Sequence, residues 1–175
     1  VLMGAFDRSL TVPSHVLYLT IGGQFNSELT LNEGLLQLKI TSEKYNKALI
    51  LPKTLQVFEI RGNFNQPIGI PEQLRELKIE GSFDHPLWLP DSVEKLCIFG
   101  VFDQSIRLSS SLRELDIGYE FNQPIALPEG LVTVKLHNHC NTITCPRTLR
   151  ECVFTRPYLH IDECIPKHVI VEYRD

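Results

Sequence analysis

The chain has 175 residues, of which 43% are hydrophobic and 22% are charged, and its formal net charge is −4. This length ordinarily forms one domain with a sizeable buried core, and the composition is that of a globular protein. The acidic balance argues against a nucleic-acid-binding surface, and no apolar run approaches the roughly eighteen residues that a membrane-spanning helix needs. We therefore expect a single domain over residues 1–175, with no nucleic-acid and no membrane partner.

An aromatic residue recurs along the chain at a nearly constant interval. The anchors are Phe6, Phe25, Tyr45, Phe64, Phe83, Phe102 and Phe121, separated by steps of 19, 20, 19, 19, 19 and 19 residues. An eighth copy fits with His139 in the anchor position, and the last segment keeps only the apolar pattern of IPKHVIVEY. A fixed period of this kind indicates stacked repeats. We expect coils that start near residues 6, 25, 45, 64, 83, 102, 121 and 139, followed by a cap over 157–175.

Each copy contains two short segments in which apolar residues alternate. Counted from the anchor, apolar residues lie at +4, +6, +10, +13 and +15, which in the fourth copy are Ile68, Ile70, Leu74, Leu77 and Ile79. A period of two is typical of a β-strand with one buried face. Pro67 and Pro71 flank the first pair and exclude a helix there. Each copy is therefore predicted to be one coil with two extended segments.

Two further columns of the repeat are typical of turns. Glycine occupies +17 at Gly23, Gly62, Gly81 and Gly100, just after the second segment, where a tight turn needs a positive φ. A short polar residue occupies +1 throughout, at Asp7, Asn26, Asn46, Asn65, Asp84, Asp103 and Asn122. Side chains of this type bond turn backbone, their own or that of the next coil, that would otherwise be buried without a partner. We interpret the polar column, like the aromatic anchors, as structural.

The repeat resembles a known family. FNQPIGIPEQL, FDHPLWLPDSV and FNQPIALPEGL are similar to the FNIP repeat, a variant of the leucine-rich repeat named for its Phe-Asn-x-Pro core. LRELKI and LRELDI are similar to the strand motif of leucine-rich repeats in general. The resemblance covers about residues 6–154, although FNIP repeats are usually longer than these. It implies an all-β, leucine-rich-repeat-like solenoid of about eight 19-residue coils plus a degenerate C-terminal cap.

The resemblance also implies a function. FNIP-repeat proteins occur in social amoebae and in large DNA viruses of amoebae, often behind an F-box. We expect a non-catalytic protein–protein interaction scaffold, located in the cytoplasm or, for a viral protein, in the virion. Two alternatives stay open: a structural component of a larger assembly such as a giant-virus particle, and the substrate-recognition part of an F-box ubiquitin-ligase adaptor. No F-box is visible in these residues.

The sequence contains no recognisable catalytic motif. The glycines follow the coil period and form no phosphate-binding loop, and the serine run Ser109–Ser111 has no histidine at a useful spacing. We therefore expect no catalytic residue and no cofactor. The five cysteines are an odd number without a regular framework, which argues against a disulfide scaffold: Cys97, Cys140, Cys145, Cys152 and Cys164.

Residues with metal-ligand side chains gather near the C-terminus: His137, His139, Cys140, Cys145, Cys152, His160, Cys164 and His168. A zinc ion that closes the solenoid is the functional interpretation. Against it, the cluster has no Cys-x-x-Cys pair, and Cys145 and Cys152 occupy columns that hold Leu, Val or Ile elsewhere. A buried cysteine behaves as a small apolar residue. We therefore expect free, buried thiols and no metal site.

Two columns point outward and are candidates for partner binding. Column +14 reads Thr20, Lys39, Glu59, Lys78, Cys97, Asp116, Lys135 and Val153, and in a parallel in-register stack Lys39, Glu59 and Lys78 are predicted to form an alternating ion-pair ladder. Column +5 reads Thr11, Thr30, Ile50, Gly69, Trp88, Arg107 and Ala126. An outward Trp beside an Arg is the composition of a binding hot spot. The alternative is that Trp88 folds across Gly69 and stacks on Arg107 for local stability.

Overall fold

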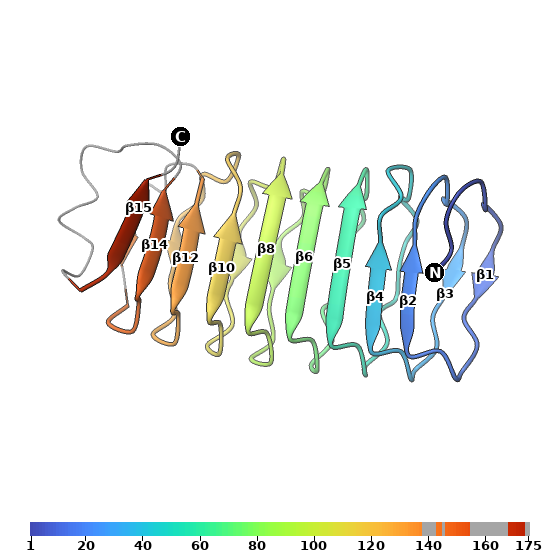
Figure 1. The fold of residues 1–175 in the computed structure, drawn as a ribbon, viewed down its shortest axis with the longest axis horizontal. Coiled ribbons are helices and arrows are strands. Elements are labelled where there is room, and N and C mark those ends of the chain that lie inside the picture. The colour runs from blue at the N-terminus through green and yellow to red at the C-terminus, as the bar shows by residue number, and fades with distance from the viewer. Residues whose placement is uncertain (138–142, 145, 155–167, 174–175) are drawn as a thin grey trace.

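The structure is a computed structural model of the chain, and it describes residues 1–137, 143–144, 146–154 and 168–173. Within these ranges the regular structure consists of strands alone. Nine of the strands form one parallel sheet that runs the length of the molecule (Figure 1). In order along the sheet they are β2 (Tyr18–Ile21), β4 (Gln37–Ile40), β5 (Val57–Gly62), β6 (Glu76–Gly81), β8 (Lys95–Gly100), β10 (Glu114–Ile117), β12 (Thr133–Leu136), β14 (Glu151–Phe154) and β15 (Ile170–Tyr173).

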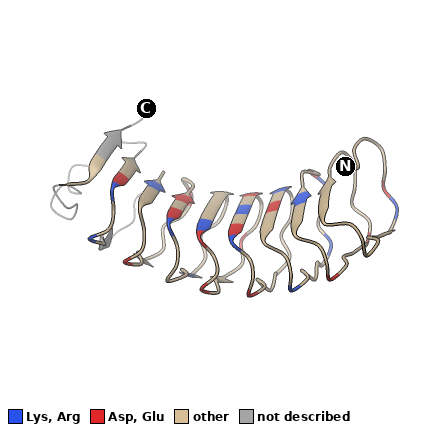
Figure 2. Cartoon of the chain, turned by 60° about the horizontal axis from the view of Figure 1, so that its bottom comes forward, with Lys and Arg blue, Asp and Glu red and all other residues tan. Residues whose placement is uncertain are grey.

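The register of this long sheet follows the sequence period. Ile60 pairs with Ile79, and Ile79 pairs with Ile98, so that each column of the repeat becomes a row across the strands. The first eight strands come one from each predicted coil, and β15 comes from the segment predicted as a cap. The chain is thus an all-β, leucine-rich-repeat-like solenoid whose coils follow a shallow arc (Figure 2).

The other extended segment of each coil forms much less sheet. Six two-residue strands pair into three separate sheets: β1 (Leu10–Thr11) with β3 (Leu29–Thr30), β7 (Leu87–Trp88) with β9 (Ile106–Arg107), and β11 (Ile125–Ala126) with β13 (Ile143–Thr144). The third and fourth coils contribute no strand here, although the sequence predicts an extended pair in every coil. The interruption begins at the step of 20 residues between Phe25 and Tyr45, where neighbouring coils no longer have equal length.

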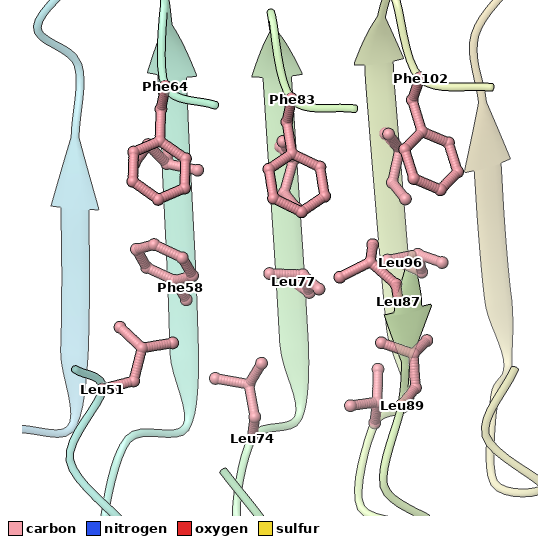
Figure 3. Packing of buried hydrophobic residues seen from close by; sticks show 14 of the residues in the cluster. Leu51, Phe58, Phe64, Leu74, Leu77, Phe83, Leu87, Leu89, Leu96 and Phe102 are labelled. Carbon is pink, nitrogen blue, oxygen red and sulfur yellow. The ribbon is translucent and has the colours of Figure 1, made fainter. Parts of the chain in front are cut away.

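The aromatic anchors stack through the interior as expected. Phe64, Phe83 and Phe102 are each at most 2% exposed, and the rings of Phe83 and Phe102 lie 6.3 Å apart between centroids (Figure 3). The six consecutive ring pairs from Phe6 to Phe121 have centroid separations of 5.6 to 6.3 Å and interplanar angles of 1° to 14°. The eighth anchor, His139, lies outside the described residues. The spine gives every described coil the same buried centre.

The polar column at +1 forms a ladder between coils. The Asn46 side-chain oxygen accepts the backbone N–H of Asn65 at 2.9 Å, and the Asn65 oxygen accepts that of Asp84 at 3.0 Å. The same bond recurs in the other coils between Asp7 and Asn122. Most of these bonds are exposed to solvent. The expected bonds to the turn backbone of the next coil are confirmed, but most of that backbone is exposed rather than buried.

The glycines at +17 adopt the predicted backbone conformation. The φ angles of Gly62, Gly81 and Gly100 are 96°, 124° and 107°. A Cβ on Gly81 would overlap the Gly62 carbonyl oxygen of the preceding coil. In the coil with the extra residue, Ser42 stands at this position instead and is fully buried, and its hydroxyl donates to the carbonyl of Phe25 at 2.8 Å.

Candidate protein-interaction surface

Trp88 points away from the core on the face of the short strands. Its neighbours Leu87 and Leu89 are only 1% and 6% exposed, and the alternation of a β-strand places the side chain between them outside. The Trp88 side chain is 68% exposed. Arg107 is its register partner on the next coil and is also exposed. The structure therefore brings these two predicted residues side by side on one surface.

Ile50 lies on the same face two coils away. It is 88% exposed, between the buried Leu49 and Leu51. Gly69 occupies the coil between Ile50 and Trp88, and a Cβ built on Gly69 would meet no other atom within 4 Å. The indole of Trp88 therefore does not fold across Gly69, which contradicts the expected covering of that position. Ile50 and Trp88 stand on either side of an open gap, which we call the Gly69 gap.

A shallow hollow of about 440 Å³ adjoins Trp88 on this face. Asp91 forms one side of it and accepts hydrogen bonds from the Ser110 hydroxyl at 2.9 Å and the Ser110 backbone N–H at 3.2 Å. These two bonds hold the pKa of the Asp91 carboxyl below its ordinary value. The hollow is lined by Glu72, Leu89, Pro90, Asp91, Arg107, Leu108, Ser110 and Pro128. Arg107 takes part in none of the ion pairs formed by the described residues, so its guanidinium is available to a partner.

Charged residues of both signs lie along several strands of the long sheet (Figure 2). Lys39 and Glu59 form the expected ion pair at 3.0 Å. The expected continuation to Lys78 is wrong, because Lys78 pairs with Glu80 at 2.8 Å. Arg61 lies between the two acids, 2.8 Å from Glu59 and 3.0 Å from Glu80, and takes the place that the ladder assigned to Lys78. Burial opposes ionisation of Glu59, but the hydrogen bonds from Lys39 and Arg61 lower the pKa of its carboxyl.

The same face carries a cluster that sequence reasoning missed. The ring of His137 packs against Phe99 at 5.4 Å and Tyr119 at 5.1 Å between centroids, and its Nε2 lies 3.0 Å from a carboxylate oxygen of Asp116. Phe99 and His137 are two coils apart in one column, and Gly118 stands between them. A glycine between two large residues of one column was the signal that these rings meet.

Among the described residues, neither Cys97 nor Ser109 is arranged as a catalytic nucleophile. Burial, and then the nearby Asp116 carboxylate, raise the pKa of the Cys97 thiol to about 11, so the thiol is protonated at neutral pH. Ser109 is fully buried, and its hydroxyl accepts the backbone N–H of Ser111 at 3.1 Å within the turn. We interpret Cys97 and Ser109 as structural residues of the solenoid.

The predicted free thiols and the C-terminal cluster are only partly described. Cys97 is a free thiol, and Cys152 is buried as expected for its apolar column. His168 contacts the carbonyl oxygen of Leu149 at 3.1 Å. In the described part of the chain, no three His, Cys, Asp or Glu residues come together to hold a metal ion. The other members of the cluster lie outside that part: His139, Cys140, Cys145, His160 and Cys164.

Comparison with known proteins finds a likeness among solved structures. No family model matches the chain, and no curated protein matches it. Among solved structures, that of CroV588, described as a novel circular LRR protein, resembles the chain with 19% sequence identity and a TM-score of 0.41. The match covers 98% of this chain and 42% of the other, so this chain spans less than half of that protein. Within the described ranges, no helix is long and apolar enough to cross a membrane.

Proposed function

We propose that the chain is a non-catalytic protein-interaction scaffold of the FNIP type, and that its partner binds the face of the short strands around Trp88. The observation that carries this proposal is the pair of large apolar side chains on that face. Trp88 and Ile50 are 68% and 88% exposed, and the Gly69 gap between them is open. Such a scaffold works in the cytoplasm or, for a viral protein, in the virion.

The backbone under these residues supports binding. The buried neighbours Leu49, Leu51, Leu87 and Leu89 hold the two coils against the core, so a partner meets side chains on a fixed frame. Tryptophan beside arginine is the composition enriched at binding hot spots, because the indole contributes a large contact area with few rotatable bonds. Extended repeat surfaces are commonly used in this way.

The long-sheet face is a weaker candidate for the same role. Lys39, Glu59, Arg61, Glu80 and Lys78 already neutralise one another. A partner would have to displace these ion pairs, and exposed pairs of this kind contribute only about 0–1 kcal/mol each to begin with. We infer that this face chiefly maintains solubility and register.

Trp88→Ala tests the proposal in the full chain. Proteins that the chain retains from its native source would be identified by mass spectrometry, and the affinity of a purified partner would then be measured. We expect Trp88→Ala to weaken that affinity by at least about 2 kcal/mol, while the free energy of unfolding changes little. Tyr119→Ala is the matched control, since Tyr119 is an aromatic residue 52% exposed on the long-sheet side. A partner that binds the Trp88 variant normally but loses affinity for the Tyr119 variant would move the site to the other face.

A further inference from the structure

We propose that one partner of this surface is a second copy of the chain, and that the two copies form a two-fold dimer in which each Trp88 fills the Gly69 gap of the other. The inference rests on the proposed function, because it names the occupant of the same surface. Its basis is that the face carries both a protrusion and a matching hole on adjacent coils.

The protrusion and the hole have compatible sizes. The stacked anchors of these coils lie 6.1 Å (Tyr45–Phe64) and 6.2 Å (Phe64–Phe83) apart between centroids, which places Ile50 and Trp88 about 12 Å apart across the Gly69 coil. An indole ring about 3.5 Å thick fits within that distance. Nothing from the same chain fills this space, since no atom lies within 4 Å of a Cβ at Gly69. The gap therefore accepts a flat aromatic side chain from outside.

A two-fold axis makes the fit reciprocal. We place the two-fold axis perpendicular to the face, between the coil of Gly69 and the coil of Trp88. The coils of the two copies then follow one another in opposite directions. Each Trp88 faces the Gly69 of the other copy. The contact then reads Ile50, Trp88 of the second copy, Trp88, and Ile50 of the second copy, and Arg107 of each copy lies opposite Ile50 of the other. The two indoles stack on each other between two isoleucines, and four exposed apolar side chains become buried together.

The charges around the gap are compatible with this arrangement. The same axis reverses the order of positions within each coil. A residue at position +8 of the repeat in one copy therefore faces a residue at position +2 in the other copy. Glu72 then faces His85, and Asp91 faces the uncharged Gln66. The two lysines of the third coil likewise face uncharged residues, Lys47 opposite Ser110 and Lys53 opposite Gln104. No like charges oppose each other at these positions, where such pairs would disfavour association.

The chain provides its own reporter for a test. Trp88 is the only tryptophan, so the intrinsic fluorescence reports on this contact alone. We expect sedimentation of the full chain to show a monomer–dimer equilibrium, and the tryptophan emission to shift to longer wavelength on dilution with the same midpoint. A tryptophan emission maximum, excited selectively over the five tyrosines, that stays constant while the dimer dissociates would overturn the proposal.

Gly69→Arg tests the hole directly. A Cβ at this position meets no other atom within 4 Å and the φ of Gly69 lies outside the left-handed region, so the variant is expected to fold normally, as circular dichroism would check. We expect Gly69→Arg and Trp88→Ala each to raise the dimer dissociation constant at least about thirtyfold. Thr11→Arg, on the same column in the first coil, is the matched control and is expected to leave the constant unchanged.

The outcomes separate this inference from the proposed function. A chain that stays monomeric at all concentrations, or a dimer that survives Gly69→Arg, contradicts the two-fold contact. If the monomer still binds another protein in a Trp88-dependent way, the proposed function stands without the dimer. If neither self-association nor binding depends on Trp88, both are wrong.

Discussion

The two long faces of this solenoid are built from the same repeat but differ in how closely their backbones are paired. The long sheet continues without a break from β2 to β15, whereas the opposite face has three separate pairs of two-residue strands. The exposed side chains in the middle of the two faces differ as well, with interlocked ion pairs on the long sheet and the apolar Ile50 and Trp88 on the other face. A continuous hydrogen-bonded sheet maintains the stack, and the less regular face is free to carry side chains that the stack does not need.

The largest effect is expected in the aromatic spine that both faces share. Phe83→Ala removes a ring that is 1% exposed in the middle of the stack, and we expect a loss of about 3–5 kcal/mol in the free energy of unfolding. Chemical denaturation measures it. Phe6→Ala is the control, because Phe6 is half-buried at the end of the row and its loss should cost less. Equal losses at the two positions would show that the spine is not the common core of the faces.

The second-largest expected effect is an increase in the free energy of unfolding. Tyr45 takes the place of Phe in one coil, and its hydroxyl is buried without a hydrogen-bond partner. Burial, and then the nearby Glu28 carboxylate, raise the pKa of Tyr45 to about 12, so the group stays neutral. Replacing Tyr45 with Phe removes an unsatisfied polar group, and we expect the protein to gain about 1–2 kcal/mol of stability. A loss of stability on this change would mean that the hydroxyl is bonded after all.

The ion-pair network of the long sheet is predicted to contribute modestly. Glu59→Gln removes the carboxylate that Lys39 and Arg61 share, and we expect a loss of about 1 kcal/mol at neutral pH and low salt. The pKa of Glu59 is lower in the folded chain than its ordinary value, so its contribution is present above that ordinary value and is lost as the pH falls. Unfolding curves between neutral and acidic pH should therefore converge for the wild type and the variant. Curves that stay parallel down to low pH would exclude the carboxylate as the cause.

The smallest effect on stability is expected at the most exposed ring. Trp88→Ala should change the free energy of unfolding of the monomer by less than about 0.5 kcal/mol, because the side chain is 68% exposed and does not cover Gly69. Thermal and chemical denaturation at a concentration below that of self-association give this value. A loss above about 1 kcal/mol in the free energy of unfolding, with binding unchanged, would show that Trp88 stabilises the fold rather than binds a partner. The two faces would then not differ in function.

The sequence by itself determined the solenoid. The recurrence of one aromatic anchor and five apolar positions predicted the parallel register, the stacked rings, the buried Cys152 and the positive φ at the +17 glycines. These features follow from sequence because every copy repeats the same local pattern. A residue in a buried column has only its counterparts in the neighbouring coils to pack against, so its surroundings are known once the period is known.

Only the tertiary structure decided how the exposed side chains are partnered. Lys78 reaches Glu80 rather than Glu59 because a long flexible side chain has several acceptors at similar distances, and Arg61 already holds Glu59. The meeting of Phe99 with His137, and the open gap beside Trp88, likewise depend on what a glycine leaves free between neighbouring coils. The repeat period places these residues in a column. The direction of each exposed side chain depends on a balance of weak surface contacts, which the repeat pattern does not predict.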